Sequence, residues 1–366
     1  MRITRNGLRA LVGSCSLAMV FALSAPTMGQ LSSRILDASQ PLTADQRAEV
    51  EAFAEAQVES LAERDPRAST EARRRLVSPL TQRSSSRTFR LVYDDVLTPR
   101  LIALIEDGER PIHARVAALH LLGAIASDRS TAALQDFLVA DQEAIRYAAA
   151  IAAQRAFARI IEGEAMLSNN RQRELDLARW LKAAISSERN DLPLHAQFAA
   201  LGASSNATDA VEYLSGGLQD QLRDVYDGGP DARIARFQDA LQRSLNQYLQ
   251  LKLEGAPNLA NLEKLMIQTA VMSLVLAIDD ATEESDLTPR QRTAYAELAR
   301  TAESVLVVVT GQTESTTGIS QAFSSSDYAQ ANTVLASRWL DSSGPILRQS
   351  SWGFAAGDFE ESRLFP

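Results

Sequence analysis

Apolar residues recur every three or four positions through most of the chain, and this spacing places them along one face of an α-helix. A first helix is expected over residues 44–64, where the apolar stripe consists of Val50, Phe53, Ala54, Val58 and Leu61. Thr43 stands before this stripe and Gln46 follows three residues later, a spacing that predicts a capping box at the helix start. Asp65-Pro66 is expected to end the helix.

The same periodicity predicts a run of shorter helices up to residue 203. They are expected at about 70–77, 89–97, 99–107, 112–126, 130–140, 142–162, 171–187 and 193–203. Pro99 follows Thr98 and is interpreted as the first residue of its helix, where a missing N–H costs nothing. Residues 81–88 are rich in serine and arginine and are expected to form a polar loop.

Three of these predicted helices are rich in alanine and apolar around most of their circumference. They begin near His113, Ala144 and His195, so their offsets are 31 and 51 residues, and a more amphipathic helix precedes each. The mean offset is near the period of about 40 residues that helix-pair solenoids show. In such a solenoid each helix pair buries its apolar face against the next pair, and alanine lets neighbouring helices approach closely.

The alanine-rich helices carry a recurring pattern in which a hydrophobic residue and an arginine precede two alanines. It occurs in residues 141–149 with Arg146, where an acidic residue opens it, and again in residues 111–119 with Arg115. The third copy departs from the pattern because Gln197 stands where the arginine is expected. The pattern resembles the second helix of the HEAT-repeat family, over about residues 88 to 205. That resemblance implies a surface for protein binding or scaffolding, because the family has no common chemistry.

The pattern changes after residue 228, and three longer helices are expected, at 231–253, 258–279 and 289–310. Thr288 and Gln291 predict a second capping box at the start of the last of these helices. The apolar run 265–278 has only 14 residues and includes polar side chains, so it is too short to span a bilayer and is predicted to be a buried core helix. The three helices are expected to pack as a bundle.

The last part of the chain is expected to be a Ser/Thr-rich linker to residue 326, one more helix over 327–340, and little regular structure from 341 to 366. Its aromatic side chains, either a recognition tail or groups that pack back on the bundle, are Trp339, Trp352, Phe354, Phe359 and Phe365. The predicted fold is all-α. Its parts are N-terminal helices with an arginine-rich segment (30–87), an irregular HEAT-like α-solenoid (88–228), a helical bundle (229–310), and a linker, short helix and flexible C-terminal tail (311–366).

Residues 1–29 have the features of a secretory export signal. Three arginines and no acid open the segment, and an apolar stretch of 16 residues follows, short of the ~20 that a spanning helix needs. Thr27 and Gly29 place small side chains at the −3 and −1 positions of a cut before Gln30. We predict a cleaved signal and a periplasmic or extracellular bacterial protein with no transmembrane segment in the mature chain. The alternatives are an uncleaved anchor and lipidation of Cys15.

The amino-acid composition limits the kinds of bond and partner that the mature chain can have. Cys15 is the only cysteine, so removal of the signal leaves no disulfide and no thiolate. Removal also takes three arginines and changes the formal net charge from −9 to −12. An acidic balance of this size argues against nucleic acid or an anionic membrane surface as the partner.

Positive charge is concentrated in one segment of this acidic chain. Eight arginines lie between Arg64 and Arg90 against two acids, which gives +6 in 27 residues. One interpretation is a docking face for another protein or an anionic envelope component, carried by Arg73, Arg74, Arg75, Arg83 and Arg87. The other is that these arginines pair with the acids of the preceding helix over residues 45–63.

Few residues of the sequence are candidates for a catalytic or metal-binding site. Asp279-Asp280-x-x-Glu283 is similar to the magnesium-diphosphate motif of isoprenoid synthases, but no second acidic motif accompanies it, and a helix end is the simpler interpretation. His113, His120 and His195 lack the spacing of a zinc site and are expected to pack between helices. We therefore predict no catalytic residue, no cofactor and no metal.

The sequence therefore favours an exported, non-enzymatic helical-repeat protein that binds or scaffolds other molecules in the periplasm or cell envelope. The alternatives are an all-helical enzyme with an unrecognised site and a purely structural envelope protein. An enzyme would need a concave pocket with converging polar groups, which a scaffold does not need.

Overall fold

The computed structural model describes residues 30–82, 85–226, 228, 231–283, 287–312, 318–341 and 344–366. The predicted export signal, residues 1–29, lies outside the described residues. So does Arg83, one of the five arginines of the predicted docking face.

The described residues form helices and no β-strand, which confirms the all-α prediction. The α-helices are α1 (Ser33–Leu36), α2 (Ala44–Leu61), α3 (Pro66–Thr81), α4 (Arg87–Glu106), α5 (Ile112–Ile125), α6 (Asp128–Phe137), α7 (Glu143–Ile161), α8 (Asn170–Ser187), α9 (Asp191–Leu201), α10 (Ala207–Tyr226), α11 (Ile234–Leu253), α12 (Ala260–Glu283), α13 (Pro289–Thr310), α14 (Gly318–Ser324), α15 (Tyr328–Val334), α16 (Pro345–Arg348) and α17 (Glu361–Leu364). Both predicted capping boxes are present, at Thr43/Gln46 and at Thr288/Gln291.

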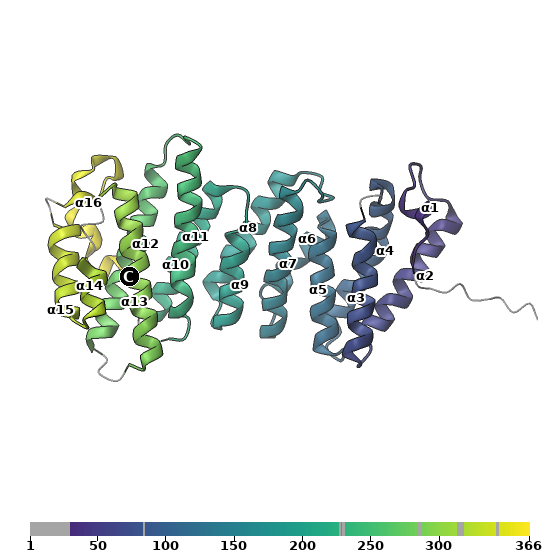
Figure 1. The fold of residues 1–366 in the computed structure, drawn as a ribbon, viewed down its shortest axis with the longest axis horizontal. Helices are drawn as coiled ribbons and strands as arrows, with labels where there is room; N and C mark the ends of the chain where they lie inside the picture. The colour runs from purple at the N-terminus through teal and green to yellow at the C-terminus, as the bar shows by residue number, and fades with distance from the viewer. Residues whose placement is uncertain are drawn as a thin grey trace, which may run out of the picture.

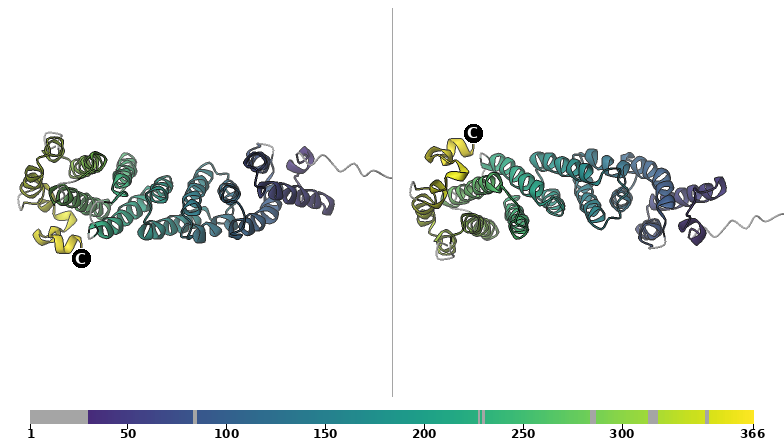
Figure 2. Two further views of the ribbon diagram at one scale, coloured as in Figure 1. Left: turned by 90° about the horizontal axis from the view of Figure 1, so that it is seen from below. Right: turned by 90° about the horizontal axis from the view of Figure 1, so that it is seen from above.

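The helices stand side by side in a row that follows the sequence from one end of the molecule to the other (Figure 1). They pack as two layers. In the first layer α3, α5, α7, α9, α11 and α13 each contact the next, and in the second layer α2, α4, α6, α8, α10 and α12 do the same. Figure 2 shows the row from below and from above, with the chain crossing between the layers. The packing continues across residue 228, so the predicted solenoid and bundle regions share one row.

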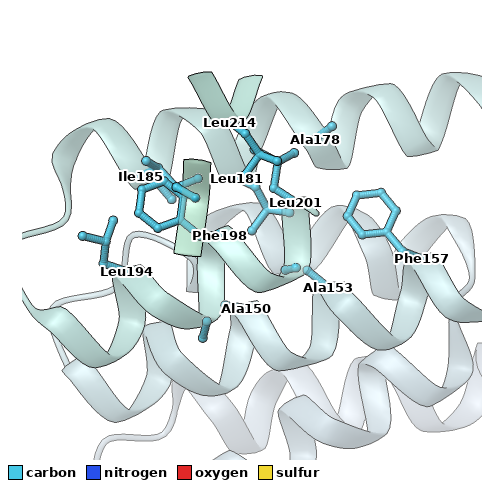
Figure 3. Close-up of a cluster of buried hydrophobic side chains, with 14 of the residues drawn as sticks. Ala150, Ala153, Phe157, Ala178, Leu181, Ile185, Leu194, Phe198, Leu201 and Leu214 are labelled. Atoms are coloured by element: carbon cyan, nitrogen blue, oxygen red, sulfur yellow. The ribbon is translucent and has the colours of Figure 1, made fainter. Parts of the chain in front are cut away.

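Small side chains let the first-layer helices lie close together. Ala150 and Ala153 of α7 are fully buried beside Phe198 and Leu201 of α9 (Figure 3). On the other side of α7, a Cβ on Gly123 of α5 would meet backbone atoms of α7. The three alanine-rich helices of the sequence are thus α5, α7 and α9, which are consecutive in one layer.

The arginines of the repeated pattern tie one helix pair to the next. Arg115 donates to the carbonyl of Ile105 at 2.7 Å and to Gln142 Oε1 at 2.8 Å. Arg146 donates to both carboxylate oxygens of Glu188, at 2.7 and 2.9 Å. Gln197, where the pattern departs, is buried and lies 3.4 Å from the same carboxylate. Whether these helix pairs are HEAT repeats stays a prediction.

The structure differs from the sequence-based expectation at α4. The predicted helices 89–97 and 99–107 are one helix that runs through Pro99. Leu97 and Leu101 on either side are fully buried, and Arg100 Nη1 donates to the carbonyl of Val96 at 2.7 Å. Tertiary packing here outweighs the cost of a proline inside a helix. In the same way α3 extends beyond the expected 70–77 and includes Pro79.

The C-terminal segment also differs from the expectation of little regular structure. Residues 344–366 form α16, α17 and two short 3₁₀ turns. Trp352 is buried and its Nε1 donates to Glu263 Oε2 of α12 at 2.9 Å. Phe365 stacks on Tyr226 at the end of α10, with ring centroids 3.9 Å apart. Individual aromatic side chains hold this segment against the helices. Such single contacts produce no helical periodicity in the sequence, so the pattern did not predict them.

Helix α12 is the last helix of the second layer. By length and composition alone it could cross a membrane, but 67% of its apolar stretch is buried inside the fold. It contacts α10, α13 and α15. This position agrees with the expectation that residues 265–278 belong to a buried core helix.

Candidate partner-binding surface

The arginines of α3 point to two different sides of the helix. Arg73 faces the first-layer helices α5 and α7, whereas Arg74 and Arg75 face Glu71. Neighbouring residues on a helix are about 100° apart, so adjacent arginines need not share a surface. The three α3 arginines of the predicted docking face are therefore divided by the helix geometry.

Arg74 and Arg75 form a local ion pair. Both donate to the Glu71 carboxylate, at 2.7 to 3.0 Å, and together they lower the pKa of Glu71 to about 2, with the Arg74 hydrogen bond contributing most. They line a cleft of about 650 Å³ between α1, α2 and α3. Among the described residues the ion pairs of Arg74 and Arg75 are with Glu71 of their own helix, and pairing of the whole segment with the acids of α2 stays a prediction.

Arg73 instead meets side chains from two other helices. Its Nη1 lies 3.3 Å from Nδ1 of His120 on α5. Arg155 of α7 reaches the same residue, with its Nη1 3.4 Å from the His120 carbonyl oxygen. Three consecutive helices of the first layer thus bring two guanidinium groups to one histidine, Arg73 at its imidazole and Arg155 at its carbonyl oxygen.

The positive surface continues toward the C-terminal ends of α3 and α7. Arg159, one turn after Arg155, donates from Nη2 to the carbonyl of Leu80 at 3.3 Å and forms an ion pair with Glu164. Arg90, in the first turn of α4, lies close enough to Arg159 and Glu164 for both charges to influence its pKa. We call Arg73, Arg90, Arg155 and Arg159 the arginine strip.

Positive charges lie close together in the arginine strip, and their mutual repulsion is electrostatically unfavourable. Burial and Arg73 lower the pKa of Arg155, and burial and Arg159 lower that of Arg90. Burial, Arg155 and Arg73 together lower the pKa of His120 to about 4, so its imidazole is neutral at neutral pH and Nδ1 can accept from Arg73. The Nε atoms of Arg90 and Arg159 are buried and have no hydrogen-bond partner among the described residues. An anionic group would relieve this repulsion.

Part of this surface was predictable from the sequence. Arg73 belongs to it, and Arg87 is exposed at the start of α4 near Arg90. Arg155 and Arg159 were not predicted, because they come from α7, some 80 residues further along the chain. A pair of arginines four residues apart on an alanine-rich helix was the signal that could have indicated them.

The acidic motif at the end of α12 lies near Glu361 of α17. Burial, followed by the charges of Glu361, Glu283 and Asp280, raises the pKa of Asp279 to about 6. The hydroxyl of Tyr295 donates to Asp280 at 2.5 Å. Among the described residues no three potential metal ligands gather at one place.

The three histidines lie in separate places along the row. His113 contacts the carbonyl of Glu63 at 3.1 Å, and His195 lies 3.0 Å from Asp239 of α11. His120 belongs to the surface beside the arginine strip. Each histidine therefore sits at a different contact between helices.

Comparison with known proteins gives no match, whether with family models, curated sequences or solved structures. The function is therefore argued from the residues and their arrangement.

Proposed function

We propose that this chain is an exported, non-enzymatic scaffold protein of the bacterial periplasm or cell envelope that holds a partner on the arginine strip. Export rests on the sequence pattern of residues 1–29. The scaffold role rests on the resemblance of residues 88–205 to the HEAT-repeat family and on an extended row of helices, which offers a long surface.

The observation that carries the proposal is the convergence of four arginines from three helices in a chain with an excess of acids. Among the described residues Glu164 pairs with the strip, through Arg159. Arginine is enriched at protein interfaces because its planar group binds carboxylates with two parallel hydrogen bonds. If this surface served stability alone, acidic side chains would be expected beside Arg73 and Arg155, because they would neutralise the positive charge.

The experiment is affinity capture and cross-linking from an envelope fraction with the mature chain as bait. The double variant Arg73→Gln/Arg155→Gln should retain about one tenth or less of the partner, because losing two interface arginines costs more than about 1.4 kcal/mol. The control is Arg110→Gln/Arg300→Gln, which removes the same charge from two exposed positions outside the strip. Equal capture by both double variants, or no specific partner for the wild type, contradicts the proposal.

A further inference from the structure

Gln30 becomes the first residue of the chain when the predicted export signal is removed before it. Its side-chain amide and the new α-amine then belong to one residue, and they can close an unstrained five-membered ring. Asparagine at the same position would need a strained four-membered ring. This chemistry therefore depends on glutamine being the residue after the cut.

The structure places Gln30 at the edge of the fold, with the chain anchored directly behind it. Gln30 is exposed, whereas the next residue, Leu31, is buried. Ile35 and Leu36 of α1 are also buried, and the carbonyl of Leu36 accepts the backbone N–H of Ser86 at 2.7 Å. The chain is therefore held in place from the second mature residue, and Gln30 itself stays open to solvent.

Gln30 also lines the cleft between α1, α2 and α3, and the charges of that cleft favour ring closure. The other charged side chains that line the cleft are Arg74, Arg75 and Glu71, so two arginines stand against one glutamate. A surplus of positive charge disfavours the ammonium form of an amine, and the neutral amine is the nucleophile. The lactam that results is uncharged, so it adds no third positive group beside the two arginines.

We infer that Gln30 of the exported chain is converted to pyroglutamate and that the arginines of the cleft favour the reaction. The α-amine nitrogen attacks Cδ of the side-chain amide and forms a new C–N bond. The bond from Cδ to the amide nitrogen breaks, and that nitrogen leaves as ammonia with the proton that the amine gives up. No oxidant, reductant or second substrate takes part. The inference rests on the export proposed above and adds a modification of the mature chain.

The first test is the intact mass of the full chain, expressed with residues 1–29 in a Gram-negative host and purified from the periplasm. The intact protein is measured because a peptide with an N-terminal glutamine cyclises during digestion. We expect the mass of residues 30–366 less one ammonia, and pyroglutamyl peptidase should remove residue 30 and expose Leu31. The matched control Gln30→Asn should show no loss of ammonia.

The second test measures the contribution of the cleft. The mature chain is released from a fusion partner by a protease that leaves Gln30 first, and the loss of ammonia is followed by intact mass at pH 7 and low salt. Arg74→Gln/Arg75→Gln should slow the reaction by about twofold or more. Arg110→Gln/Arg300→Gln removes the same charge outside the cleft and should leave the rate unchanged.

The outcomes separate this inference from export. A periplasmic chain that begins with uncyclised Gln30, or at another residue, overturns the inference and leaves export in place. Equal rates for the wild type and Arg74→Gln/Arg75→Gln overturn the role assigned to the cleft. A chain that keeps residues 1–29 and stays in the cytoplasm contradicts both the inference and the proposed export.

Discussion

We expect Glu188→Ala to lower the free energy of unfolding by about 3 to 5 kcal/mol. The Glu188 side chain is 1% exposed and accepts two hydrogen bonds from Arg146, whose own side chain is 14% exposed. It also accepts the backbone N–H groups of Arg189 and Asn190, each at 3.0 Å. Burial raises the pKa of this carboxyl, and the hydrogen bonds and charge of Arg146 outweigh it, so that the pKa ends below its ordinary value.

Removing this carboxylate leaves a largely buried guanidinium without its counter-charge and two backbone donors without an acceptor. Urea unfolding followed by circular dichroism measures the effect. The control is Glu49→Ala at an exposed position of α2, which should change stability by less than about 0.5 kcal/mol. A loss below about 1 kcal/mol for Glu188→Ala would show that the contact between Arg146 and Glu188 does not join these helix pairs.

Gly123→Ala should destabilise the protein by about 2 to 3 kcal/mol, although alanine is the better helix former. A Cβ at this position of α5 would lie 2.7 Å from the Cα of Ala152 and within 3 Å of its carbonyl carbon. Both atoms belong to the backbone of α7, so no side-chain rotation can make room. The two helices must move apart, which weakens the contact between α5 and α7 in the first layer.

Gly216→Ala is the matched control because Gly216 also lies inside a helix, α10, with only Lys182 Cε near the new Cβ, at 3.9 Å. It should raise stability by up to about 1 kcal/mol. Thermal and urea unfolding of the two variants side by side give the comparison. The same sign for both substitutions would mean that the close approach of α5 to α7 does not occur.

The sequence predicts local helical structure well because helix starts depend on nearby residues. The capping boxes at Thr43 and Thr288 depend on a partner three residues away, and both form. The alanine-rich helices were recognisable for the same reason. The continuity of α4 through Pro99 was not predictable, since it depends on the burial of Leu97 and Leu101 by other helices.

The candidate surface was only half predictable for a similar physical reason. The density of arginine around Arg73 is visible in the sequence, but the side of α3 on which each arginine lies depends on helix phase. Arg74 and Arg75 form a local pair with Glu71 and lie on the other side from Arg73. Arg155 and Arg159 join Arg73 only because α7 follows α5 in the same layer.

Site-specific photo-cross-linking in intact cells tests most directly whether the partner docks on the arginine strip. A photoreactive residue is placed at Arg87 or Ala158, which are exposed and each lie three residues from a strip arginine on the same helix, or at Leu253, which is 89% exposed at the end of α11. Docking on the strip predicts a cross-linked adduct of higher mass from Arg87 and Ala158 and none from Leu253. An adduct from Leu253 with none from the two strip positions would contradict it.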